Sequence, residues 1–158
     1  MTTVDEIRKE VQDSTRLSDY EAVDVLWVAL VKAANRQAGK NEHQRMMELV
    51  RTLSDDALIA ILNSGDTNRL LDLDPSLETV LSDRHEALYP DKTGELIRHI
   101  RECRNGEPKA GMLSLGEIIK RIRNKRAHGF KSRNSPRDAE ILGATRAILF
   151  GLLNAVLK

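Results

Sequence analysis

Residues 114–130 read S-L-G-E-I-I-K-R-I-R-N-K-R-A-H-G-F, and the fold prediction starts from them. Ser114 and Glu117 have the spacing of a capping box, in which both side chains accept backbone N–H groups at a helix start. Apolar residues then recur every three or four positions, as on a helix with one buried face. They are Leu115, Ile118, Ile119 and Ile122. Gly129 is typical of a helix end, because glycine enters the left-handed conformation at little cost. The stretch predicts a helix over about 114–127.

A run of cations occupies the end of this helix and the residues after it. Eight basic residues and no acidic residue lie between positions 120 and 137: Lys120, Arg121, Arg123, Lys125, Arg126, Lys131, Arg133 and Arg137. The rest of the chain holds 17 basic against 24 acidic residues. A basic band on an acidic body favours a local anionic partner over general coating of nucleic acid. A solvated helix end, where the helix dipole favours cations, explains the same charges without a site.

Arg123, Asn124 and His128 are the residues in this run that suggest chemistry. Asn124 and His128 share a helix face, whereas Arg123 and His128 lie about 140° apart unless the helix ends or distorts before Gly129. A guanidinium presents a planar fork to phosphate oxygens, and an imidazole transfers protons near neutral pH. The three side chains form a candidate site for handling a phosphate.

The segment R-N-K-R-A-H-G at 123–129 resembles the signature of the HEPN superfamily, in which an Arg precedes a His by a short spacer. In that family a polar residue commonly follows the Arg, and a Gly commonly follows the His. A polar loop and a long apolar helix come next, as in HEPN chains, so the resemblance covers 114–157 well and 94–157 loosely. It implies an all-α helical bundle of the HEPN type. The expected core helices are about 94–104, 114–127 and 136–157, with N-terminal helices of no recognised family in 1–90.

The resemblance also implies the activity of a metal-independent endoribonuclease. In some relatives such an enzyme is part of a toxin or defence system. The RNA 2′-OH would attack the adjacent phosphate and leave a 2′,3′-cyclic phosphate and a 5′-OH. His128 would be the general acid or base, Arg123 would stabilise transition-state charge, and Asn124 would orient the histidine or bind a phosphate oxygen. The RNA backbone would lie along Lys120, Arg121, Lys125, Arg126, Lys131 and Arg133. No metal and no cofactor is expected.

One motif supplies one histidine, whereas proton transfer on both sides of a scissile phosphate needs two groups. The family arrangement, a homodimer with a composite active site, is therefore expected. HEPN toxins often carry a Tyr two residues after the His, which a nucleotidyltransferase antitoxin modifies, but this chain has Phe130. That departure argues against tyrosine-linked silencing and leaves open an antitoxin or other regulatory partner of a different kind.

Two other interpretations of the same residues remain open. One is a non-catalytic HEPN-like module that binds RNA or a protein partner without cutting. The other is a helical scaffold whose basic band is only a solvated surface.

Composition bounds the class of protein. A chain of 158 residues forms one domain that buries about two-thirds of its unfolded surface. Cys103 is the only cysteine, which excludes an internal disulfide and a multi-cysteine zinc site. The N-terminal residues have no apolar signal region, and the longest apolar run, 25–31, is far shorter than a membrane span. A cytoplasmic protein with no membrane partner is expected.

Helix-start signals divide the rest of the chain. Ser18, Asn41 and Ser54 are predicted caps of helices over about 18–35, 42–53 and 54–64, after a first helix over 3–13. The segment 25–31, apolar all round, is placed in the core with Trp27 as an anchor. A loop is expected over 65–75, then a helix from 75 to 87. Pro136 begins the last helix. Its row of small residues predicts close approach of another helix, within the chain or in a dimer: Gly143, Ala147, Gly151 and Ala155.

Overall fold

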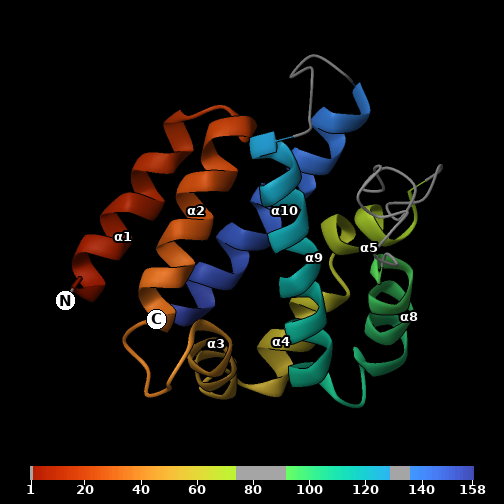
Figure 1. Ribbon diagram of the computed structural model, residues 1–158, viewed down its shortest axis with the longest axis horizontal. Helices are drawn as coiled ribbons and strands as arrows, with labels where there is room; N and C mark the ends of the chain where they lie inside the picture. The colour runs from red at the N-terminus through yellow and green to blue at the C-terminus, as the bar shows by residue number, and fades with distance from the viewer. Residues whose placement is uncertain (1, 74–91, 129–135) are drawn as a thin grey trace.

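The computed structural model describes residues 2–73, 92–128 and 136–158, with the side chains of 125–128 outside the description. All regular secondary structure in these ranges is helical. The elements are α1 (Val4–Asp13), the short 3₁₀ helix η1 (Ser14–Arg16), α2 (Asp19–Ala34), α3 (Glu42–Arg51), α4 (Asp55–Leu62), α5 (Gly65–Leu71), α8 (Thr93–Cys103), α9 (Pro108–His128) and α10 (Pro136–Val156). They pack against one another as a bundle (Figure 1), which confirms the all-α prediction.

Three of the predicted helix starts are confirmed by their hydrogen bonds. The side chains of Ser18, Asn41 and Ser54 each accept a backbone N–H three residues on, at 3.3, 2.9 and 3.2 Å. Each bond satisfies one of the donors that the first turn of a helix leaves unpaired. These local signals therefore set the start of α2, α3 and α4.

One hydrophobic core joins both halves of the chain. α9 packs mainly on α8, with further contacts to α4, α3 and α2, and α10 packs mainly on α2 and then α5 (Figure 1). α9 and α10 follow each other in sequence, yet each makes its main contacts with other helices. The three predicted core helices are in the core, and α1 to α5 complete it with residues such as Ile7, Leu26 and Leu58, which are fully buried.

The predicted start of the motif helix at Ser114 is wrong. α9 begins six residues earlier, at Pro108, whose fixed φ and missing N–H suit the first helical position. Ser114 is only 8% exposed, and its hydroxyl lies 2.7 Å from Nδ1 of His99 on α8. The apolar stripe extends back to Met112, which is 2% exposed. Ser114 and Glu117 thus have capping-box spacing inside a helix.

Residues 65–71 form a helix, so the predicted loop is wrong there. The Ser64 hydroxyl caps α5 by accepting the N–H of Thr67 at 3.2 Å. Leu70 and Leu71 are buried in the core, and α5 packs on α10. Burial of this pair stabilises a helix whose sequence alone gives little periodicity. The helix expected over 75–87 lies outside the described residues.

The apolar centre of α2 is mostly in the core, as predicted. Leu26 and Leu30 are buried, and Trp27 is only 7% exposed. Val28 is the exception, with 38% of its surface exposed, so the segment is not buried on every side. The helix therefore presents one edge to solvent.

The small residues of α10 do not form one uniform contact with another helix. A Cβ added at Gly143 would lie 3.2 Å from Oδ2 of Asp19, at the start of α2, whereas one at Gly151 would meet no heavy atom within 4 Å. By length and composition α10 alone among the described helices could cross a membrane. Part of this helix, including Ile141, Ile148 and Leu152, is buried in the bundle.

Side chains of α1 and α10 tie distant parts of the chain together. Nε of Arg8 donates to the carbonyl of Leu157 at 3.1 Å, and its Nη2 donates to the same oxygen. Arg146 on α10 reaches the turn between α1 and α2, where it meets the carbonyls of Ser14 and Leu17 and the carboxylate of Asp19. Hydrogen bonds and one ion pair thus connect α1, α2 and the turn between them to the C-terminal part of the chain.

Candidate functional site

The buried face of α9 determines which motif residues reach the surface. Leu115, Ile118, Ile119 and Ile122 are at most 1% exposed. The helix therefore turns Lys120 and Asn124 to solvent and leaves Arg121 and Arg123 half-buried. The described part of the predicted site is a polar edge at the C-terminal end of α9.

Arg123 is held by an acidic residue of α2. Its Nε donates to Oδ1 of Asp24 at 3.0 Å, and the two side chains are 33% and 36% exposed. Nη1 lies at 3.5 Å from Oδ1 of Asn124, at the limit of a hydrogen bond. The guanidinium is therefore fixed through Nε, while its Nη side stays available to a ligand.

The backbone of α9 is helical through His128. On a regular helix the Cα atoms of Arg123 and His128 are about 140° apart around the axis, whereas those of Asn124 and His128 are about 40° apart. The helix does not end early enough to bring Arg123 and His128 to one side of the same chain. A site that uses both residues gains from a second copy of α9.

The remaining predicted site residues divide into two groups. Lys120, Arg121, Arg123 and Asn124 lie together on the last described turns of α9. The side chains of Lys125, Arg126 and His128, and all of Lys131 and Arg133, lie outside the described residues. The described residues therefore include only the first half of the basic band, and this half lies on one stretch of α9.

Sequence reasoning missed Asp24. It lies 99 residues before Arg123, and no local pattern links the two. The only available signal was an acidic residue in α2 between two apolar positions, which has many structural explanations. Its role emerges only once α2 packs against α9.

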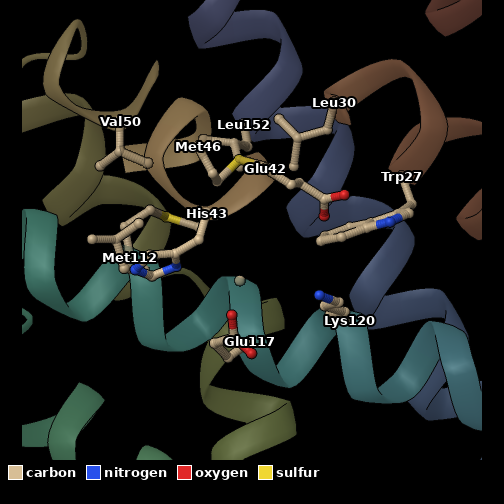
Figure 2. A pocket seen from close by; sticks show the side chains of 12 residues that line it. Trp27, Leu30, Glu42, His43, Met46, Val50, Met112, Glu117, Lys120 and Leu152 are labelled. Atoms are coloured by element: carbon tan, nitrogen blue, oxygen red, sulfur yellow. The ribbon is translucent and has the colours of Figure 1, made fainter. Parts of the chain in front are cut away.

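Lys120 also lies at the mouth of a cavity. The cavity is enclosed by side chains of α2, α3, α9 and α10 (Figure 2). Lys120 and Glu117 come from α9, Glu42 and His43 from α3, and Trp27 from α2. A residue predicted to contact RNA is thus also part of a separate pocket.

A metal site and a reactive thiol each place requirements on the described residues. No group of three or more His, Cys, Asp or Glu side chains there is placed to hold a metal ion. Desolvation, together with Glu107 and Glu102, raises the pKa of the Cys103 thiol. A raised pKa lowers the thiolate fraction, and with it the nucleophilicity of this cysteine.

Comparison of the chain with protein-family models, with curated proteins and with solved structures finds no match. The resemblance to HEPN chains therefore rests on the sequence of the motif and of the helix that follows it.

Proposed function

We propose that the chain is a metal-independent endoribonuclease of the HEPN type that cleaves RNA by attack of the 2′-OH on the adjacent phosphate. The observation that carries the proposal is the fixed Arg123 guanidinium at the polar end of α9, next to Asn124 and five residues before His128. Guanidinium groups held in advance stabilise charge that develops on a phosphate without reorganising during the reaction.

The chemistry assigns one task to each motif residue. A base removes the 2′-OH proton, the 2′-oxygen bonds to phosphorus, and the bond to the 5′-oxygen breaks as an acid protonates it. His128 serves as the base or the acid, Arg123 binds the non-bridging oxygens, and Asn124 orients the histidine or the phosphate. The exposed Lys120 holds the RNA backbone without reading bases, together with Arg121, Lys125, Arg126, Lys131 and Arg133.

The proposal includes a homodimer. Because α9 stays helical through His128, Arg123 and His128 of one chain stand on different sides of the helix. Two motif ends facing each other across a two-fold axis would supply both the acid and the base. Control by an antitoxin or another regulatory partner belongs to the same proposal.

The direct test is cleavage of a labelled RNA by purified protein in excess EDTA. Cleavage should persist in chelator and yield fragments with 2′,3′-cyclic phosphate and 5′-OH ends. The measurement is an analysis of the fragment ends. A kinase labels 5′-OH ends directly, without earlier phosphatase treatment. Activity that disappears in EDTA and returns with a divalent ion would contradict the mechanism.

The ion pair between Asp24 and Arg123 gives a second prediction. In Asp24→Asn the guanidinium loses its fixed orientation, while the site gains one unit of positive charge. We expect RNA to bind at least as tightly and kcat to fall about tenfold. Single-turnover rates at saturating RNA, with filter binding, separate the two effects.

Asp66→Asn is the matched control, because it removes a carboxylate that pairs with Arg69 on the surface of α5. The control should cleave like the wild type. Equal rates in the control and in Asp24→Asn would mean that Asp24 has no part in positioning Arg123.

One observation favours a non-catalytic RNA-binding module as the alternative. Asp24 neutralises the charge of Arg123, and a neutralised guanidinium stabilises a phosphorane less well. Such a module would bind RNA with a strong salt dependence and leave it uncut. Binding without cleavage in the EDTA assay and with added divalent ions would support this alternative.

A further inference from the structure

The cavity between α2, α3, α9 and α10 has walls made almost entirely of apolar side chains (Figure 2). They are Trp27, Leu30, Met46, Val50, Met112 and Leu152. Its volume is about 60 Å³, whereas one buried water needs about 10–15 Å³ by the same measure. An apolar cavity of this size has room for a branched aliphatic group of about four carbons. Waters there would find few partners, so such a group would be favoured over them.

Gly116 keeps this space open. It lies in the middle of α9 and lines the cavity, and a Cβ added there would meet no heavy atom within 4 Å. A glycine in a helix interior costs about 1 kcal/mol relative to alanine. Glycine is the least favourable helix residue other than proline, and no neighbouring atom is close enough to require a glycine at this position. The cavity is therefore open here because residue 116 has no side chain, and not because tight packing forces a glycine.

Four polar side chains surround the mouth of the cavity: Glu42, His43, Glu117 and Lys120. All four are exposed, and none makes a hydrogen bond or ion pair with another residue in the described part of the chain. In Figure 2 the Glu42 carboxylate lies beside the indole of Trp27, and the Glu117 side chain lies on α9, which forms one wall of the cavity. Two carboxylates and one ammonium give the rim a fixed charge of −1. The rim therefore favours a cation.

We propose that this cavity binds a small aliphatic amine, with its hydrocarbon body between the apolar walls and its ammonium group between Glu42 and Glu117. The indole face of Trp27 adds attraction for a cation. The long stem of Lys120 lets its own ammonium move out into solvent when a ligand arrives. The proposal does not depend on RNA cleavage, since Lys120 is the only residue that the cavity and the proposed RNA site share.

The test compares three probes of nearly equal shape: isopentylamine, isopentanol and isovalerate. Trp27 is the only tryptophan in the chain, so its fluorescence reports on this cavity. Methyl-labelled methionine gives a second signal, because Met46 and Met112 line the cavity and Met47 does not. We expect saturable binding of the amine with a Kd of about 1 mM, and binding of the alcohol and the acid weaker by about tenfold or more.

Two pairs of variants separate the cavity and its charge from unspecific effects. Gly116→Leu fills the cavity and should abolish saturable binding, while Gly116→Ala should retain it more weakly. Both should unfold no earlier than the wild type, because they replace a helix glycine. Glu117→Gln should weaken amine binding about tenfold, whereas Glu102→Gln, an exposed change on α8, should leave it unchanged.

Several outcomes would overturn the proposal. Alcohol or acid bound as tightly as the amine would remove the role of the rim charge. A saturable signal that survives in Gly116→Leu would place binding outside the cavity. The absence of a saturable response to all three probes would show that the cavity is a packing defect without a ligand.

Discussion

His128→Ala is expected to fold like the wild type and to cut RNA about a hundredfold to ten-thousandfold more slowly, the range for losing a general acid or base. Arg123→Ala should lose about a hundredfold to a thousandfold, because a positioned donor to the phosphate disappears. Its ion pair with Asp24 is one-third exposed, so the free energy of unfolding should change by at most about 1 kcal/mol. The measurement is single-turnover cleavage, with far-UV circular dichroism as the check on folding.

Arg137→Ala is the matched control for charge, since Arg137 is an exposed cation of the same basic run but outside the proposed site. It should keep nearly full activity. If His128→Ala keeps wild-type activity after contaminating nuclease has been excluded, the catalytic assignment is wrong. If Arg123→Ala and Arg137→Ala lose activity equally, the loss follows the total charge and not the motif.

The same variant tests the composite site. When wild-type and His128→Ala chains are mixed in equal amounts and exchanged, about a quarter of randomly paired dimers contain two wild-type chains. Activity near a quarter means that both histidines are required, and activity near half means that each chain works alone. A fully active protein that is monomeric by light scattering would rule out the composite site and leave the motif assignment standing.

Arg146→Ala is expected to cause the largest loss of stability among the surface-accessible changes. Nη1 donates to the Leu17 carbonyl at 2.8 Å and to Oδ1 of Asp19 at 2.9 Å, and Nη2 donates to the Ser14 carbonyl at 2.8 Å. The side chain is 23% exposed, so solvent compensates only part of the loss. We expect the free energy of unfolding to fall by about 2–3 kcal/mol and Tm by about 5–10 °C.

The control for Arg146→Ala is Arg51→Ala. Arg51 pairs with Glu48 on the surface of α3, and the two side chains are 61% and 42% exposed. Its loss should change the free energy of unfolding by no more than about 0.5 kcal/mol. Urea unfolding followed by circular dichroism measures both variants. Equal midpoints for the two would mean that the bonds of Arg146 to the turn contribute no net stability.

Local sequence rules predicted the parts of the fold that local chemistry determines. The caps at Ser18, Asn41 and Ser54 need only a side chain and a backbone N–H three residues away, so they could be read directly. The Ile stripe of α9 was equally readable, because burial repeats with the helix period. These features predicted an all-α bundle and a helix whose polar side carries Arg123 and Asn124.

Features that depend on distant partners could not be read in this way. Ser114 has the spacing of a cap, but in the folded chain its hydroxyl meets His99 on the neighbouring helix. α5 is stabilised by the burial of Leu70 and Leu71, and it packs against α10, a helix that begins 65 residues later. The partner of Arg123 lies on α2, and the cavity beside Lys120 needs four helices in place. Sequence patterns therefore located the candidate site without its surroundings.

The attachment of α1 and α2 to α10 has a consequence during protein synthesis. The main packing partner of α2 is α10, and the side chain of Arg8 bonds to the carbonyl of Leu157, 149 residues away. α2 leaves the ribosome long before α10 exists, so the face of α2 that packs on α10 stays uncovered until α10 has emerged. Contacts of such high sequence separation also slow folding. The bundle therefore closes after translation of α10, and no shorter nascent chain holds the completed core.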